Sequence, residues 1–227
     1  NGGIVYASEI KTLFASGLVH PAVDEQQVSA YLAHGYVPGP ATIFKGVSKL
    51  QPGQRLNIDR RGNRQLTTYW RPAPGSTPPP QSMEMAVEQM IDLLRDSVRL
   101  QLRSDVPVGA LLSGGLDSGL LVALASEESS RPVTTFTVRF EGASVDESPL
   151  AAEIAERYGT DHHCLELPMD DAADILPSAL WYCDEPVNDA ALLPNLMIER
   201  ELSKAMKVAL NGTGGDELFC GYGRYFQ

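Results

Sequence analysis

The sequence predicts an α/β protein in which a parallel β-sheet domain follows a smaller, β-rich segment. In the second half of the chain, short apolar or β-branched runs alternate with stretches of helical periodicity, which is the pattern of parallel βαβ units. Residues 71–80 contain five prolines in ten positions, so they form neither a helix nor a central strand and separate the two parts. With 227 residues, 43% of them hydrophobic, the chain is long enough to bury a core without disulfides.

The N-terminal part, residues 1–65, contains short elements interrupted by turn-forming residues. Asp24 is a good N-cap for a helix, and Gly35 and Pro38 follow that helix as a clear break. The patterns predict, in order, a strand over 3–8, a helical turn over 10–14, a helix over 24–34, a strand over 53–58 and a turn over 59–63.

The part after the proline-rich stretch alternates helices and strands. Its first helix is amphipathic, and the apolar stripe expected in the core consists of Met83, Val87, Met90, Ile91 and Leu94. Pro149 stands where a first-turn proline would, at the start of a later helix. The other patterns predict strands over 106–112, 133–140, 164–167 and 208–210 and helices from 120 and over 149–158, 172–182 and 192–206.

Charge and cysteine content exclude several classes of protein. Lys and Arg number 18 against 29 Asp and Glu, which gives a net charge of −11 and argues against broad nucleic-acid binding. The three cysteines form no CxxC pair, which favours a reducing compartment, and we expect a cytoplasmic protein. No apolar run approaches the ~18 residues of a membrane span, so no membrane partner is expected. Because the chain opens on Asn1 without an initiator Met, we expect it to be a fragment.

The strongest local signal is the run LLSGGLDS at 111–118, between a predicted strand and a predicted helix. Gly114 and Gly115 allow close approach of the backbone, and Ser113 and Ser118 offer hydroxyl groups. The helix N-terminus adds free N–H groups and a partial positive charge, so the run predicts an anion cradle. It lacks both the GxxxxGK[ST] pattern and the GxGxxG pattern, which excludes a Walker loop and the dinucleotide fingerprint.

Asp117 is unusual inside such a cradle. A carboxylate that faces a bound phosphate repels it unless a divalent cation lies between them, so Asp117 suggests Mg²⁺ bridging to a polyphosphate. The alternative interpretation is a glycine-containing turn in which Asp117 or Ser118 is an ordinary N-cap. The strand–loop–helix context favours the phosphate loop.

The SGGLDS run resembles the pyrophosphate-loop motif of ATP pyrophosphatases, and other stretches narrow the resemblance. The chain resembles class B, glutamine-dependent asparagine synthetases in order and from end to end, on the stretches 7–11, 35–40, 42–47, 184–186 and 214–222. This resemblance implies a partial glutaminase segment of Ntn-hydrolase type, with α+β structure, over 1–65. It further implies a linker over 66–82 and an ATP pyrophosphatase domain, similar to the adenine nucleotide alpha hydrolases and truncated at its C-terminus, over 83–227.

The resemblance also implies an activity. Members of the family adenylate the side-chain carboxylate of aspartate with ATP, and ammonia released from glutamine then displaces AMP. Adenylation makes chemical sense because a free carboxylate would have to expel oxide, whereas AMP is a good leaving group. The implied cofactors are ATP and Mg²⁺, the substrates are small molecules, and a homodimer is one candidate assembly. The family's glutaminase uses an N-terminal Cys that this chain does not contain, so no glutaminase activity is expected of the chain alone.

Site residues follow from the resemblance position by position. The pyrophosphate-binding residues are Ser113, Gly114, Gly115, Asp117 and Ser118, and the Mg²⁺ carboxylates are Asp117 and Asp216. Leu111 and Val138 match positions near the adenine and ribose, and Gly212 matches a backbone contact to the nucleotide.

The segment 184–186 has two interpretations. Asp184 and Glu185 form either a loop that contacts substrate or ATP, as the resemblance implies, or a helix-terminal turn stopped by Pro186.

One position departs from the family pattern. Thr213 stands where the family has a Glu that is thought to assist proton movement during amide formation. A threonine hydroxyl cannot act as a base near neutral pH, so the catalytic base stays open, with Glu217 close by in the sequence. Two alternatives therefore stay open beside asparagine synthesis. One is a related amidotransferase or β-lactam-forming synthetase with another acceptor acid, and the other is a nucleotide-binding module without turnover.

Overall fold

The computed structural model describes residues 3–72, 79–142, 146–168 and 172–223, which fall into two compact units. Unit 1 comprises Asn1–Thr77 and Ala172–Leu193, and unit 2 comprises Pro78–Asp171 and Pro194–Gln227. Residues 172–193 thus pack with the N-terminal segment, although they lie far along the chain. The predicted division into 1–65, 66–82 and 83–227 did not foresee that residues 172–193 belong to unit 1, and it stays a prediction. Residues 73–78 of the proline-rich stretch lie outside the described residues.

Unit 1 is built from short helices and one β-hairpin. Its elements are α1 (Ile10–Ala15), α2 (Glu25–His34), β1 (Gln54–Ile58), β2 (Arg64–Thr68) and α6 (Ala172–Cys183). β1 and β2 pair antiparallel, with Leu56 opposite Leu66. The predicted N-cap of α2 is confirmed, because the Asp24 carboxylate accepts a hydrogen bond from the N–H of Gln26. Gly35, with a φ of 79°, ends the helix in the left-handed conformation.

The strand expected over residues 3–8 is wrong. Described residues of this segment take part in no sheet, and Tyr6 is 87% exposed. A strand exists only through hydrogen bonds to a neighbouring strand, and the described sheets contain no partner for this segment. Its local pattern was therefore insufficient to make it a strand.

Unit 2 contains a four-stranded parallel sheet, which confirms the predicted α/β domain. The strands are β3 (Val108–Leu111), β4 (Thr134–Phe140), β5 (Asp161–Leu167) and β6 (Val208–Leu210), in the spatial order β5-β4-β3-β6. β4 and β5 pair along their full length, from Thr134 opposite Asp161 to Phe140 opposite Leu167. β6 returns to the other side of β3, with Ala209 opposite Gly109.

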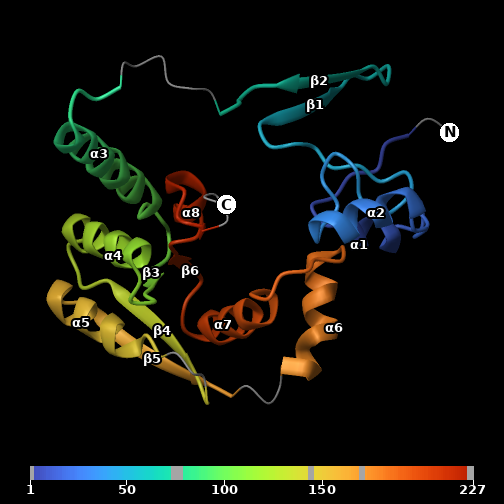
Figure 1. The fold of residues 1–227 in the computed structure, drawn as a ribbon. Coiled ribbons are helices and arrows are strands. Elements are labelled where there is room, and N and C mark those ends of the chain that lie inside the picture. Colours follow the sequence, from blue (N-terminus) through green and yellow to red (C-terminus); the bar gives the residue numbers. More distant parts are fainter. Residues whose placement is uncertain (1–2, 73–78, 143–145, 169–171, 224–227) are drawn as a thin grey trace. The chain divides into compact units, whose positions relative to one another are not determined.

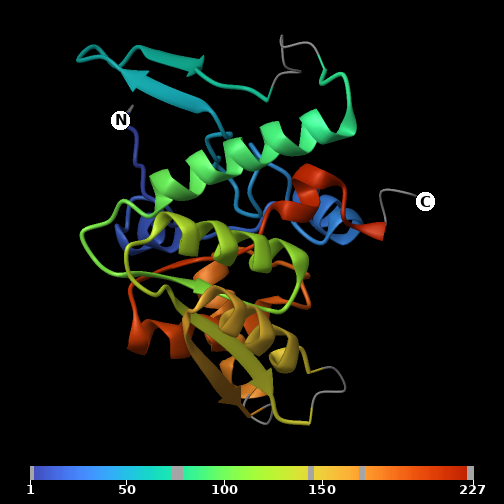
Figure 2. The ribbon, with the colours of Figure 1, turned by 90° about the vertical axis from the view of Figure 1, so that its left-hand side faces the viewer.

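Helices cover both faces of this sheet (Figures 1 and 2). They are α3 (Met83–Gln101), α4 (Leu116–Glu128), α5 (Ser148–Tyr158) and α7 (Leu192–Ala205), and the short α8 (Gly215–Phe219) follows β6. α3, α4 and α5 lie on one side and α7 on the other (Figure 1). Right-handed crossovers explain this arrangement, because the chain moves in one direction from β3 to β5 and in the opposite direction from β5 to β6.

The core of unit 2 lies between the sheet and α3–α5. It includes Val98, Ala110, Leu112, Val122 and Leu124, all at most 3% exposed. The expectation for the apolar stripe of α3 is wrong at the start of that helix, where Met83 is 75% and Val87 46% exposed. Only the later turns of α3, such as those with Ile91 and Leu94, pack against the core cluster.

The strand order reverses between β3 and β6. In open α/β sheets, ligands bind outside the carboxyl ends of the strands at such a reversal, because the flanking loops diverge there and leave a crevice. The loops after β3 and after β6 begin at this point. None of the helices in the described part of the chain has the length and apolarity needed to cross a membrane.

Candidate functional site

A cavity of about 740 Å³ opens in unit 2 where β3, β4 and β6 end. It is lined by the loop after β3, the start of α4, the end of β4, the start of α5, one residue of α7 and the loop after β6. Predicted site residues that line it are Leu111, Ser113, Gly115, Asp117, Ser118, Val138, Gly212, Thr213 and Asp216. The fold thus brings the two predicted loops to one cavity, as the strand order requires.

The loop after β3 is closed by its own serines. The N–H of Ser113 donates to the Ser118 hydroxyl at 3.2 Å, and the two serine hydroxyl oxygens lie 2.9 Å apart. The Ser118 hydroxyl can in turn donate to the carbonyl of Gly115, while the N–H of Gly115 donates to the Ser113 hydroxyl. Ser118 is buried, so its hydroxyl fixes the shape of the loop from inside.

Gly114 lets this loop approach α5. Its φ of 79° lies in the left-handed region, and a Cβ there would stand 3.0 Å from the carbonyl oxygen of Glu147. Gly114 is the one predicted pyrophosphate residue that is not part of the cavity lining. Gly114 instead lies on the side of the loop that packs against the start of α5.

The N-terminus of α4 faces the loop with unpaired donors. By helix geometry the N–H groups of Leu116, Asp117 and Ser118 have no carbonyl partner within the helix, and all three residues line the cavity. The thirteen residues of α4 add a partial positive charge at this end. Backbone donors and dipole together favour an anion at this place.

The loop after β6 is a tight turn. The Asn211 side-chain oxygen accepts a hydrogen bond from the N–H of Thr213 at 3.1 Å, and the N–H of Gly215 donates to the carbonyl of Gly212 at 3.2 Å. Gly214 has a φ of 101°, which only glycine adopts without strain. Thr213 is exposed at the turn and lines the cavity.

Asp117 and Asp216 reach the cavity from the first turns of two different helices, α4 and α8. Both are half-buried, and within the described residues neither carboxylate has a hydrogen bond or an ion pair. Two carboxylates on one cavity beside an anion cradle fit Mg²⁺, which takes one or two carboxylates and completes its shell with water and phosphate oxygens. The described residues contain no group of three or more His, Cys, Asp or Glu placed to hold a metal ion, so the donor set does not resemble an all-protein cage.

Apolar side chains form the wall of the cavity beside these groups. Leu111 and Val138, both predicted, lie there together with Phe136, Phe140 and Ile198, which the sequence analysis missed. Phe136 and Phe140 stand two residues before and after Val138 on β4, so the period-two alternation of a strand would have placed them on the same face. An apolar wall of this kind suits a planar aromatic base.

Two further carboxylates line the cavity. Glu147 precedes α5, and Glu217 accepts a hydrogen bond from the Tyr222 hydroxyl at 3.1 Å. Glu147 was missed, although it lies in the connection after β4, which opens at the same edge of the sheet. The described lining residues include no Lys or Arg, so a bound polyphosphate would need a cation to offset the negative charge of the wall.

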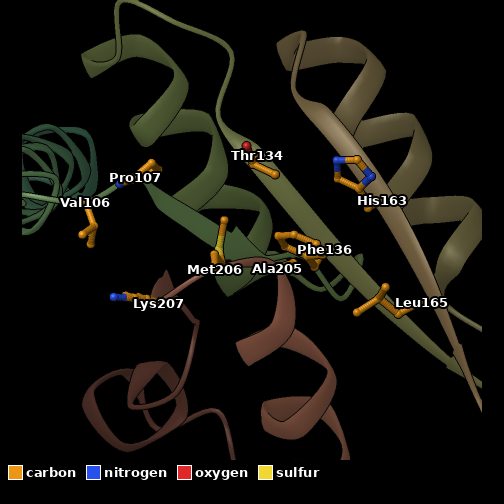
Figure 3. A pocket seen from close by; sticks show the side chains of 9 residues that line it. All are labelled: Val106, Pro107, Thr134, Phe136, His163, Leu165, Ala205, Met206 and Lys207. Atoms are coloured by element: carbon orange, nitrogen blue, oxygen red, sulfur yellow. The ribbon is translucent and has the colours of Figure 1, made fainter.

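A second hollow, of about 550 Å³, lies toward the other ends of the strands, next to the end of α7 (Figure 3). It is lined by Val106, Pro107, Thr134, Phe136, His163, Leu165, Ala205, Met206 and Lys207. The His163 ring stacks on Phe136 with a centroid distance of 5.3 Å. None of the predicted site residues lines this hollow, although Phe136 lines both cavities.

Asp184 and Glu185 lie in unit 1, where both carboxylates have protein partners. The N–H of Ile10 donates to Asp184 at 2.7 Å, and the N–H and the ammonium group of Lys11 donate to it at 3.2 and 3.0 Å. Partial burial raises the pKa of Asp184, but the hydrogen bonds from Lys11 and Ile10 outweigh this effect and hold the pKa below its ordinary value.

Glu185 is bound even more tightly. It is 8% exposed, accepts a hydrogen bond from the N–H of Ile43 at 2.7 Å and pairs with Lys49. α6 ends directly before Asp184, whose φ of 62° makes a turn there. These contacts agree with the helix-terminal turn, and the alternative of a substrate loop stays a prediction.

The comparisons with curated proteins agree with the sequence resemblance. The chain is 34% identical over 226 residues to glutamine-hydrolyzing asparagine synthetase 1 of Bacillus subtilis and 31% identical over 233 residues to asparagine synthetase 3 of the same organism. It is 29% identical over 238 residues to amidase chyE of Penicillium rubens. These alignments cover 99%, 96% and 97% of this chain but 35%, 38% and 35% of the relatives, so the chain spans about a third of their length.

Solved structures give weaker matches. An NH₃-dependent NAD synthetase from Campylobacter jejuni matches with a TM-score of 0.40 at 19% identity, over 60% of each chain. A glutamine-dependent NAD⁺ synthetase from Acinetobacter baumannii matches with a TM-score of 0.42 at 23% identity, over 74% of this chain and 31% of that chain.

Two family models divide the chain between them. The model for a glutamine amidotransferase domain matches residues 1–70, which agrees with the expected origin of the N-terminal segment. The model for asparagine synthase matches residues 89–227, which is more than half of the chain and includes every lining residue of the cavity. The chain therefore belongs to the asparagine synthase family.

Proposed function

We propose that unit 2 binds MgATP for an ATP-dependent, AMP-forming amide synthetase that activates a carboxylate as an acyl-adenylate. One observation carries this proposal: a single cavity at the strand-order reversal joins the SGGLDS loop, the N-terminus of α4 and the carboxylates of Asp117 and Asp216. Backbone N–H groups would bind the polyphosphate, because the N–H groups and the dipole at a helix N-terminus favour an anion.

The cavity residues divide into three roles in this proposal. Asp117 and Asp216 would hold Mg²⁺, which when bound offsets the charge of the phosphates and of the departing pyrophosphate. Leu111 and Val138, with Phe136 and Phe140, would contact the adenine and ribose. The backbone of Gly212, in the loop after β6, would contact the nucleotide.

We propose aspartate as the acceptor acid and ammonia from glutamine as the nucleophile. The identity to proteins named glutamine-hydrolyzing asparagine synthetases supports this choice. Thr213 in the cavity supports the second candidate, an amide or β-lactam synthetase with another acid, because a proton must leave the nucleophile and a threonine hydroxyl cannot take it. An amidase among the relatives agrees with such variation.

An exchange assay tests the proposal and separates the candidates. The protein that carries this chain, at its natural length, should exchange labelled pyrophosphate into ATP only when its proper acid is present. Exchange that depends on aspartate would support asparagine synthesis, and exchange that depends on another acid would support the second candidate. An absence of exchange with every acid, together with measurable ATP binding, would leave a nucleotide-binding module without turnover and overturn the proposal.

A further inference from the structure

The carboxylate of Asp117 lies in the space that a side chain at position 215 would fill. Gly215 begins α8, on the loop after β6, and Asp117 lies in the first turn of α4. A Cβ built on Gly215 would stand 2.7 Å from Cγ of Asp117 and closer still to its Oδ2. Carbon atoms pack at about 3.5–4.0 Å, so a methyl group and this carboxylate cannot occupy their places together.

Backbone conformation does not require glycine at position 215. The neighbouring Gly214 has a φ of 101°, which explains that glycine fully, and a Cβ there would meet nothing within 4 Å. Gly215 shows the opposite combination. Its φ lies outside the left-handed region, and the space that a side chain there would need is occupied by Asp117. Space, and not backbone freedom, is therefore what this glycine provides.

The atoms that would give way are those at the tip of Asp117. The backbone at 117 and 118 is held by α4 on one side and by the loop after β6 on the other. That loop packs closely, because a Cβ on Gly212 would stand 3.2 Å from both Asp117 Cβ and the Ser118 nitrogen. The carboxylate itself can turn to another staggered rotamer. A side chain at 215 would thus move the carboxylate and leave the fold largely unchanged.

We propose that Gly215 is a positioning residue for Asp117, whose carboxylate it admits to its present place on the cavity wall. The inference rests on the proposed function in one respect, because it takes Asp117 as a ligand of Mg²⁺. Any side chain at 215 turns this carboxylate away, and the nucleotide then loses the benefit of Mg²⁺ while its direct contacts to the loop after β3 stay intact. Removing a group that orients a metal ligand typically lowers metal affinity about 10- to 100-fold.

Calorimetric titration with ATP, with MgCl₂ or with a chelator, tests this on the protein at its natural length. Gly215→Ala should lose about 10- to 100-fold of the affinity gain that Mg²⁺ gives the parent, and ATP binding in chelator should stay unchanged. Gly223→Ala is the matched control, because Gly223 has no left-handed φ and a Cβ there meets none of the described residues within 4 Å. It should bind ATP as the parent does.

A double-mutant cycle separates positioning from general damage. If Gly215→Ala acts through Asp117, then adding it to Asp117→Ala should change Mg²⁺-dependent binding no further. Should Gly215→Ala alone fold poorly, the double variant should regain stability in thermal unfolding, since the displaced carboxylate is gone. A Gly215→Ala protein with the parental response to Mg²⁺, or a double variant that folds no better than a misfolded single one, would overturn the inference.

The same cycle distinguishes this failure from a failure of the proposed function. If the parent binds ATP equally well with and without Mg²⁺, the metal role of Asp117 is wrong. The stability cycle then decides on positioning alone. Gly215→Ala should destabilise the parent more than it destabilises the Asp117→Ala variant. Equal losses of stability in the two backgrounds would overturn the positioning role of Gly215.

Discussion

Two pairs of acidic residues in this chain have opposite surroundings. Asp184 and Glu185, in unit 1, accept hydrogen bonds from backbone N–H groups and pair with Lys11 and Lys49. Asp117 and Asp216, in unit 2, line the cavity, and in the described ranges neither carboxylate accepts a hydrogen bond or forms an ion pair. All four belong to motifs that resemble one enzyme family, so from the sequence each of them is a candidate site residue.

The difference separates a structural role from a binding role. A carboxylate that accepts several hydrogen bonds and meets a cation has its charge compensated within the fold, and its loss leaves buried donors unpaired. A half-buried carboxylate without such partners instead favours an external cation. The surroundings therefore favour a structural role in unit 1 for the first pair, and they support the second pair as the proposed ligands of Mg²⁺.

The largest effect is expected in the cavity, at the position where the family has a Glu. If aspartate is the acceptor, Thr213→Glu should raise amide formation from aspartate and ammonia, because general-base assistance is worth roughly 10²–10⁴-fold. Pyrophosphate exchange should change little, since adenylation needs no such base. Asparagine formation and pyrophosphate exchange are measured in parent and variant, and a parent that already forms asparagine rapidly, without gain in the variant, would show that the position needs no base.

The next effect is a loss of stability at Glu185. Glu185→Ala leaves the N–H of Ile43 without its acceptor and Lys49 without its partner, and we expect a loss of about 2–3 kcal/mol in the free energy of unfolding. Glu217→Ala is the control, because that side chain is exposed and should cost less than about 0.5 kcal/mol. Denaturant unfolding measures both. Equal stability of the two variants would contradict the structural role of Glu185.

Gly214 should show a moderate effect of a different origin. Gly214→Ala forces a side chain into a φ of 101°, at a cost of about 1–2 kcal/mol, whereas Gly223→Ala should be neutral. Unfolding curves of the two variants give the comparison. A neutral Gly214→Ala would mean that the turn after β6 can adopt another conformation.

The smallest effect concerns pH and Asp184. Because the folded state holds the pKa of Asp184 below its ordinary value of 3.8, the carboxylate contributes stability above that value and loses it as pH falls through the folded-state pKa. Asp184→Asn suits the left-handed φ of 62° and removes the titration. The stability advantage of the parent over this variant should be present near neutral pH and shrink under acid conditions. A difference that does not change with pH would contradict the role of the charge.

Much of unit 2 could be predicted because its signals are local. β3 ends in a loop that carries both glycines and serines, so the SGGLDS run alone predicts one side of the cavity. β4 shows what was available but missed, since Phe136 and Phe140 follow from Val138 by strand alternation. The start of α3 shows the reverse, because a periodic stripe does not reveal how far the core extends.

Contacts between distant residues were beyond prediction from local patterns. Asp184 meets Ile10 and Glu185 meets Ile43 across separations of 174 and 142 residues, so no local pattern distinguishes them from free carboxylates. The fit of Asp117 against Gly215 has the same character, since it depends on how two loops meet after the sheet has formed. The missing strand over 3–8 also belongs here, because a strand depends on its partner.

In the proposed function Asp117, unlike Asp184, is a ligand of Mg²⁺. Calorimetric titration with ATP, with and without Mg²⁺, tests it directly in the parent, in Asp117→Ala and in Asp184→Asn. Mg²⁺ should strengthen ATP binding in the parent and in Asp184→Asn but not in Asp117→Ala. An Asp117→Ala protein that binds MgATP as tightly as the parent would contradict it.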